Sequence, residues 1–368
     1  MKKTIYTRVQ AITLSLIMAL MLIAACSQNN PPAPSEALPP IETLPPTPTP
    51  TPTPQIDDPN PRVIHLTGNN IDMHNIVYYD STIYYVNHVY YSDTAIYRPH
   101  LISFDIDEMT QEELTDYTYQ GKYLPDSRVF TITIKAMTAD SSGNLWVYEN
   151  WWDDNKSFAG IRKLDSTGVE LLSIDISNTP AADILYMSSF NVDDAGNVYI
   201  HFGTGVNDIF MVIDITGKTL FSIDHFHSYH DTIRMSNGKL ALTYSEFDPG
   251  WKKEILREID VQSKSFNDIF EYDDDVIFQI FPGFEDYDFL FTDRNGILYG
   301  VNIETEDIVN LLKLGDIGVT YKRAYDGEHL DNTALLPDGR LVFTYLTGIH
   351  TGESNLFLYI LSDFNPIG

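Results

Sequence analysis

Residues 191–200 read NVDDAGNVYI. An apolar strand runs into a turn of Asp, Asp, Ala, Gly and Asn, and a second strand of alternating character leaves it. Glycine suits such a turn because hairpin turns need residues with positive φ. The stretch therefore predicts a β-hairpin that turns at Gly196.

The same pattern occurs six times along the chain. Each copy has an apolar strand, a turn rich in Asp, Asn or Gly, and a second strand. The other five copies are residues 76–86 (IVYYDSTIYYV), 137–148 (MTADSSGNLWVY), 233–242 (IRMSNGKLAL), 289–299 (FLFTDRNGILY) and 334–343 (ALLPDGRLVF).

A third strand usually follows and closes on an acidic residue, as at Asp105, Asp165, Asp214 and Asp260. Two of these are followed by a further short strand. Four strands in a repeat of about 40 to 60 residues are typical of a β-propeller. We therefore predict an all-β chain with a β-propeller over residues 62–368. Six blades are expected, with room for a seventh before Gly143; a β-sandwich or β-helix is the structural alternative.

The first residues have the character of an export signal. Lys2, Lys3 and Arg8 precede an apolar run over residues 11–25. A run of about 15 residues is too short to span a bilayer, which takes roughly 20. The run ends in small residues, as signal-peptidase sites do. Residues 1–25 are therefore predicted to be a signal peptide.

The end of this run, LIAAC at residues 22–26, resembles the lipobox of bacterial lipoproteins. The resemblance implies that Cys26 is acylated and becomes the mature N-terminus. Two acyl chains anchor stably where one binds only marginally. The protein is then held on the extracytoplasmic face of the cell membrane by lipid of the palmitate kind. An ordinary secretory signal is the alternative.

Residues 26–61 form the next predicted segment, a lipidated N-terminus followed by a Pro/Thr-rich linker. Thirteen of the 20 prolines lie between residues 27 and 61. Proline lacks a backbone donor, so such a segment extends as polyproline II at about 3.1 Å per residue. We expect a spacer between the membrane and the propeller.

Charge excludes one class of partner. Removal of residues 1–25 leaves 20 basic against 52 acidic residues, a formal charge of −32. Because nucleic-acid binding depends on Lys and Arg that neutralise phosphates, no nucleic-acid partner is expected. The single cysteine also excludes disulfides, thiolate metal sites and cysteine nucleophiles from the mature body.

Residues 286–314 resemble the last part of the propeller in large lipoproteins of gut Clostridia, and the glycine turns resemble those of virginiamycin-lyase-like propellers. In the Clostridial proteins a propeller lies between the lipobox and an extracellular solute-binding domain. The resemblance implies a part in extracellular solute capture. The chain ends near the point where that domain is expected, so a transport role is not implied for this chain alone.

The densest polar cluster is residues 224–231, DHFHSYHD. His225 and His227 are two apart, as in metal-binding His-x-His pairs, and His230 is expected to join them from the following loop. A divalent cation there is one hypothesis. The alternative is a solvated loop between two blades, where polar residues are expected, with no cofactor.

Aromatic residues gather near position 150. Trp151 and Trp152 stand at a strand end, with Tyr148 before them and two aspartates after. Aromatic faces beside carboxylates can stack on sugar rings, so these three residues are candidates for ligand or glycan binding. Trp146 follows its turn on a strand, and core packing is expected for it.

The Asp-rich turns faintly resemble calcium loops but lack the distal Glu that such loops require, so turn chemistry is the better interpretation. There is no phosphate-binding loop and no Gly-x-Ser-x-Gly elbow. We expect a non-catalytic, surface-anchored propeller that binds a small-molecule, glycan or protein partner. A metal-dependent lyase or hydrolase using His225, His227 and His230, or a glycan-binding module, is the alternative.

Overall fold

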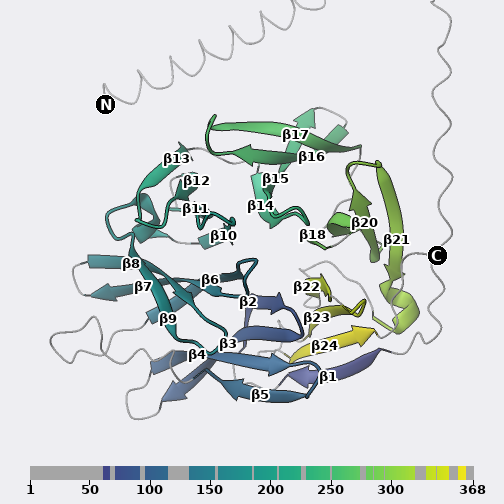
Figure 1. Ribbon diagram of the computed structural model, residues 1–368, viewed down its shortest axis with the longest axis horizontal. Helices are drawn as coiled ribbons and strands as arrows, with labels where there is room; N and C mark the ends of the chain where they lie inside the picture. Colours follow the sequence, from purple (N-terminus) through teal and green to yellow (C-terminus); the bar gives the residue numbers. More distant parts are fainter. Residues whose placement is uncertain are drawn as a thin grey trace, which may run out of the picture. The chain divides into compact units, whose positions relative to one another are not determined.

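The computed structural model contains six four-stranded antiparallel β-sheets, the blades of a β-propeller (Figure 1). The predicted signal peptide, Cys26 and the linker up to residue 60 lie outside the residues that the structure describes. The described residues are 61–66, 71–91, 96–114, 132–153, 156–184, 186–204, 207–224, 229–248, 251–273, 279–284, 286–293, 295–319, 329–336, 338–347 and 355–361.

Blades 1 to 5 each use four consecutive strands, ordered from the inner edge of the sheet to its outer edge. Blade 1 is β2 (Ile71–Tyr79), β3 (Thr82–Tyr91), β4 (Ile96–Asp105) and β5 (Thr110–Glu113). Blade 2 is β6 (Ile132–Ala139), β7 (Leu145–Asp153), β8 (Lys156–Leu164) and β9 (Glu170–Asp175). Blade 3 is β10 (Tyr186–Val192), β11 (Val198–Gly203), β12 (Asp208–Ile213) and β13 (Thr219–Asp224). Blade 4 is β14 (Tyr229–Arg234), β15 (Leu240–Asp248), β16 (Trp251–Asp260) and β17 (Ser265–Asp273). Blade 5 is β18 (Gln279–Phe284), β19 (Tyr287–Thr292), β20 (Ile297–Asn302) and β21 (Asp307–Lys313).

Blade 6 joins the two ends of the described chain. Its order is β22 (His329–Leu335), β23 (Leu341–Thr347), β24 (Asn355–Leu361) and, at the outer edge, β1 (Arg62–Leu66). Pairs run from Arg62 with Ile360 to Leu66 with Leu356. Strand β1 therefore closes the ring, because it fills an edge that β24 would otherwise expose.

The core is divided among the interfaces between blades. Six clusters of buried apolar side chains occur among the described residues, and each draws on two neighbouring blades. The cluster between blades 2 and 3, for example, contains Trp146 and Phe202, and the one between blades 6 and 1 contains Leu66 and Tyr85. Six clusters for six interfaces confirm a closed ring of six blades. Trp146 is buried, as expected for a core residue.

The glycine turns form as the sequence predicts. Gly143, Gly196, Gly238 and Gly339 have φ between 78° and 85°, and each ends the turn between an inner strand and the second strand of its blade. Blade 1 has Asp80 at φ 50° in the corresponding turn. Positive φ is costly for most side chains but not for glycine, which explains the recurrence.

Blade 5 departs from the expected order. The turn at residues 293–296 was expected to join the first two strands of its repeat, but it joins β19 to β20, the second and third strands. The inner strand of blade 5 is β18, and only residues 285–286 separate it from β19. The local turn signal is the same in both places, and only contacts with other blades decide which strand is innermost.

Among the residues that the structure describes, the helical structure is two short 3₁₀ helices. These are η1 (Pro180–Asp183) and η2 (Leu314–Ile317), which follow the outer strands of blades 2 and 5. Within the part of the chain that the structure describes, no helix is long and apolar enough to cross a membrane.

Candidate functional site

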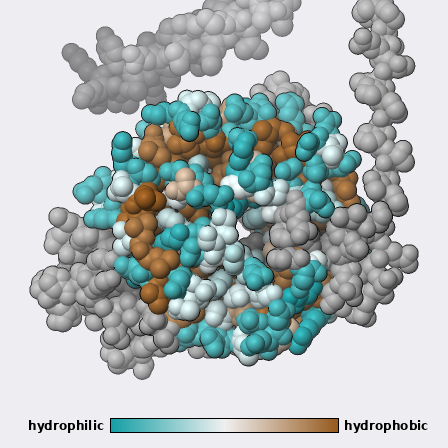
Figure 2. All heavy atoms as spheres, in the orientation of Figure 1, coloured by the Kyte–Doolittle hydropathy of each residue, from teal (hydrophilic) through white to brown (hydrophobic). Residues whose placement is uncertain are grey.

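Each blade has two ends with different connections. Because neighbouring strands are antiparallel, the turns from inner to second strand and from third to outer strand lie at one end, which we call the turn end. The connections from second to third strand and from one blade to the next lie at the other, the loop end. The middle of the ring is hollowed on the face in Figure 2, and residues of intermediate or hydrophilic character border the hollow.

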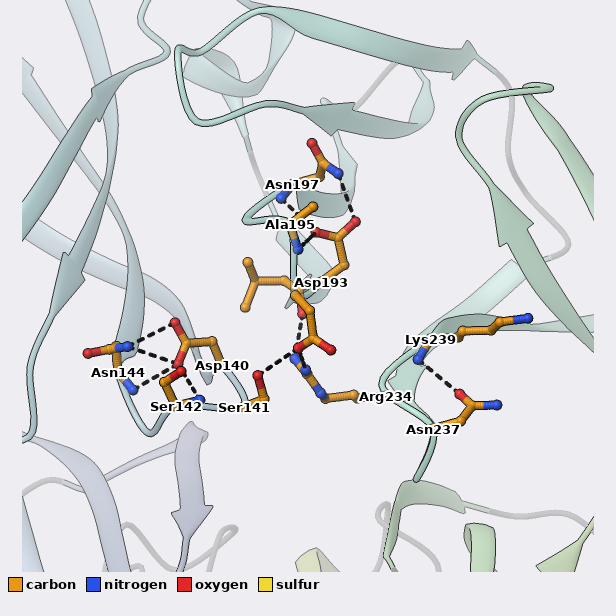
Figure 3. A network of polar contacts seen from close by, with 12 residues as sticks. Asp140, Ser141, Ser142, Asn144, Asp193, Ala195, Asn197, Arg234, Asn237 and Lys239 are labelled. Carbon is orange, nitrogen blue, oxygen red and sulfur yellow. Dashed lines mark hydrogen bonds and ion pairs between the residues drawn. The ribbon is translucent and has the colours of Figure 1, made fainter.

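At the turn end, carboxylates accept hydrogen bonds from their own turns. Asp140 accepts from the backbone amides of Ser142 and Asn144 at 2.9 and 3.0 Å (Figure 3). It also accepts from Nε1 of Trp146 at 3.1 Å. Nζ of Lys163 lies 2.8 Å from Oδ2 of the same carboxylate. Burial raises the pKa of Asp140, but the hydrogen bonds from Lys163, Trp146 and Asn144 outweigh it and lower the pKa to about 2.

The acidic residues that close the third strands behave in the same way. Oδ1 of Asp165 accepts from the amides of Thr167 and Val169, and Asp214 accepts from Thr216 and Lys218. A hydroxyl hydrogen bond, from Thr167 and Thr216 respectively, is the main cause that lowers the pKa of each carboxyl. In both residues Oδ1 is the atom that accepts the amide hydrogen bonds, as in an Asx turn.

Turns of neighbouring blades are also bonded to one another. Oγ of Ser141 in blade 2 donates to Asp194 in blade 3 at 2.7 Å, and Arg234 in blade 4 pairs with the same carboxylate (Figure 3). Oγ of Ser236 in blade 4 donates to Asp288 in blade 5 at 3.2 Å. A guanidinium nitrogen of Arg340 in blade 6 lies 3.3 Å from the hydroxyl of Ser81 in blade 1. The turn end is therefore a hydrogen-bonded belt.

Above this belt, five of the six inner strands bulge at one level. The pairing register shifts in β2, β6, β10, β14 and β22, whereas β18 keeps a regular register. In each of these five strands we count back from the last residue that pairs with the second strand of the blade. The residue four positions before it lies in the bulge. These residues are Asn75, Lys135, Ser188, His230 and Asp331, and all are polar. Bulges are enriched beside functional sites because they redirect side chains.

Buried polar groups without partners gather at the same level. Oδ1 of Asn75, both polar atoms of the Asn150 side chain, Oγ of Ser189 and Oγ1 of Thr344 are buried and have no hydrogen-bond partner among the described residues. Asn75 lies in the β2 bulge, Ser189 follows the β10 bulge, and Thr344 pairs with Asn332, which follows the β22 bulge. Asn150 pairs with Thr133, two residues before the β6 bulge.

These residues form what we call the polar layer: the five bulge residues Asn75, Lys135, Ser188, His230 and Asp331, with Asn150, Ser189 and Thr344 beside them. A buried polar atom left unpaired costs about 1 to 3 kcal/mol. Several at one level favour a partner from outside the protein, either ordered water or a ligand. The polar layer is the candidate functional site.

The predicted histidine cluster lies at the loop end, between β13 and β14. His225 and His227 are outside the described residues. His230, expected in a loop, lies in the inner strand β14 and is one of the five bulge residues. Among described residues, no group of three His, Asp or Glu is placed to hold a metal ion. The metal hypothesis therefore stays a prediction.

The predicted aromatic site is divided between core and loop end. Tyr148 is fully buried between blades 2 and 3, and its hydroxyl donates to the carbonyl of Ala181 in η1. In this position it is a core residue. Trp151 and Trp152 lie at the loop end of β7, directly after Asn150. A glycan-binding role for the two tryptophans stays a prediction.

Sequence reasoning missed most of the polar layer. Only His230 was among the predicted site residues. One sequence feature could have indicated a bulge. Lys135 is a charged residue within the otherwise apolar residues 134–137 of an inner strand. It becomes visible only when the six repeats are aligned on their turns and compared position by position.

No protein-family model matches the chain, and no curated protein matches it either. Solved structures share the fold. A luciferin-regenerating enzyme is 10% identical, with a TM-score of 0.47 over 83% of this chain and 96% of that one. The β-propeller domain of the Trilobed protease from Pyrococcus furiosus, which has an open velcro topology, is 11% identical, with a TM-score of 0.43 over 80% and 82%. An oligogalacturonate lyase in complex with manganese is 14% identical, with a TM-score of 0.43 over 77% and 74%. The likeness concerns the fold alone.

Proposed function

We propose that this protein is a ligand-binding β-propeller held at the outer face of the cell membrane through Cys26. It captures a small polar solute in the polar layer. The observation that carries this proposal is the coincidence of two features at one level of the ring. Five inner strands bulge there with polar residues, and buried polar atoms that have no hydrogen-bond partner among the described residues lie beside four of these bulges.

The placement of the two ends supports the same function. The described chain enters the propeller at Arg62, which pairs with Ile360 at the end of β24. The next residue of β24, Leu361, pairs with Leu341, the first residue after the turn between β22 and β23. The chain therefore enters at the turn end. In our proposal, solutes therefore reach the polar layer from the opposite side, the loop end.

The test of solute binding uses residues 62–368 as a soluble body. Its thermal unfolding is measured with amino acids, sugars, dicarboxylates and nucleosides, and hits are confirmed by calorimetry. Binding that is abolished by Asn150→Leu but kept by Asp194→Ala at the turn end supports the proposal. Binding that Asn150→Leu leaves unchanged places the ligand elsewhere and contradicts it.

Anchoring is tested on the full chain in a bacterial host. We expect the wild-type protein to incorporate labelled palmitate and to sediment with membranes, and Cys26→Ser to do neither. A Cys26→Ser protein that still sediments with membranes would mean that another segment anchors it.

A further inference from the structure

The side chain of Asn150 combines an unpaired donor, Nδ2, with an unpaired acceptor, Oδ1. The residue is 0% exposed, and neither atom has a hydrogen-bond partner among the described residues. We infer that the ligand of the polar layer is an uncharged molecule that presents an amide, or a lactam ring with N–H and C=O groups side by side, to Asn150. This inference rests on the proposed function and names the chemical class of its ligand.

The side chain of Asn150 lies on the face of blade 2 that packs against blade 3. Strand β7 pairs with β8 in a regular register, so side chains two residues apart share one face of the sheet. Trp146 and Tyr148 pack in the apolar cluster between blades 2 and 3, and Asn150 continues their row. The amide of Asn150 therefore stands at the end of an apolar interface, where an unpaired polar group is costly.

The nearest buried charges have partners within the protein. Nη2 of Arg162 donates to Oε2 of Glu149 at 3.1 Å, and the two side chains are 9% and 2% exposed. Lys135 also has an interaction of its own. The other unpaired buried atoms beside the bulges belong to neutral side chains, those of Asn75, Ser189 and Thr344. The groups that these side chains leave for a ligand are therefore amides and hydroxyls.

An amide supplies both groups that Asn150 lacks. Its N–H donates to Oδ1 and its carbonyl accepts from Nδ2, so two amides meet through two parallel hydrogen bonds in opposite directions. A carboxylate accepts but does not donate, and moving its charge to a fully buried position costs far more than moving an amide. The formal charge of −29 on the chain disfavours anions as well.

Residues 176–184, which connect blade 2 to blade 3, border this position. The backbone amide of Ile176 donates to the carbonyl of Ala159 at 3.0 Å, and Ala159 is the residue of β8 that pairs with Asn150. Further along this segment, a carbonyl of η1 accepts from the hydroxyl of Tyr148. A ligand reaches Asn150 when this segment moves aside, and its amide is enclosed once bound. Enclosure strengthens the hydrogen bonds, because the local dielectric is low.

The experiment compares matched small molecules by calorimetry on residues 62–368. Acetamide, nicotinamide and uracil present the amide or lactam groups. Acetate and nicotinate carry a carboxylate in place of the amide, and N,N-dimethylacetamide and 1,3-dimethyluracil keep the carbonyl but lack the N–H. These comparisons use wild-type protein, so they do not depend on the folding of any variant.

Two variants then test the residue itself. Asn150→Leu removes both polar atoms, and Asn150→Asp keeps an acceptor oxygen but removes the donor. Asn237→Asp is the matched control, because Asn237 is exposed at the turn end. Its Oδ1 accepts from the backbone amide of Lys239, and an aspartate keeps that acceptor.

We expect at least one of the three amides to bind and its counterparts to bind at least about tenfold more weakly. Both Asn150 variants should lose at least about tenfold in affinity for it, while the control keeps wild-type affinity. Counterparts that bind as tightly as the amide, or amide binding that both Asn150 variants keep, overturn the inference.

Two further outcomes separate this inference from the proposed function. If a sugar or a dicarboxylate binds in an Asn150-dependent manner and no amide does, the inference fails while the proposed function stands. If neither the amides nor the amino acids, sugars, dicarboxylates and nucleosides bind, both fail.

Discussion

Asp140 at the turn end and Asn150 beside the polar layer are both buried polar residues of blade 2, yet their surroundings are opposite. Asp140 is 8% exposed, and its two oxygens accept bonds from two backbone amides, an indole and an ammonium. Asn150 is 0% exposed, and neither of its polar atoms has a partner among the described residues. The comparison shows that Asp140 is bonded to other groups of its own blade, whereas Asn150 is not, and this difference supports our proposal that the polar layer serves another molecule.

The largest expected effect is at the turn end. Asp140→Ala removes the acceptor of Lys163 and Trp146 and leaves both donors without their partner. We expect the free energy of unfolding to fall by about 2 to 4 kcal/mol in urea titrations. Ligand binding in the polar layer should be unaffected. An Asp140→Ala protein with wild-type stability would contradict the structural role of the hydrogen bonds within this turn.

The second effect is a loss of stability in acid. The folded-state pKa of Asp140 is about 2, below its ordinary value of 3.8. A depressed pKa means that the stabilisation is present above 3.8 and is lost as pH falls toward 2. The carboxyls of Asp165, Asp214 and Asp260 shift in the same direction. Wild-type protein should therefore lose more stability than Asp140→Asn over this range, as measured by urea unfolding at a series of pH values. Parallel curves for the two proteins would remove Asp140 as a contributor.

A smaller effect is expected at the exposed part of the belt. The side chain of Asp194 is 59% exposed, although it contacts both Ser141 and Arg234. Surface ion pairs contribute little, so Asp194→Ala should cost at most about 1 kcal/mol. A loss as large as that of Asp140→Ala would mean that the links between turns matter more than the bonds within them.

The smallest expected effect is a change in tryptophan fluorescence at the loop end, where Trp151 and Trp152 lie. If Trp151 and Trp152 stack on sugars, oligosaccharides should quench tryptophan fluorescence, and Trp151→Ala with Trp152→Ala should abolish the quenching. The buried Trp146 would keep its own emission and serve as an internal reference. Absence of quenching across wall and host glycans would remove the glycan hypothesis.

The features predictable from sequence are those that local chemistry encodes. Glycine with positive φ marks the turns, and Asp214 marks the end of a third strand because its carboxylate accepts amides two and four residues later. These local signals predicted the number of blades and, in every blade except blade 5, the turn between the inner and second strands.

Features that depend on pairing partners were not predictable. Strand β1 pairs with β24, about 290 residues further along the chain, and no local signal connects them. The bulges were not predictable for the same reason, because the position of the extra residue in β6 is defined only by its register with β7. The inner position of β18 is set by contacts with other blades, which is why the order of blade 5 was wrong.

Urea unfolding of Asn150→Leu in the absence of ligand distinguishes a binding residue from a structural one. Leucine has a similar volume and no polar atoms, so the substitution removes unpaired polar groups from a fully buried position. We predict that the free energy of unfolding stays the same or rises by about 1 to 2 kcal/mol, while ligand binding is lost. A fall of about 2 kcal/mol or more, like that expected for Asp140→Ala, would mean that Asn150 is a structural residue and would contradict the account.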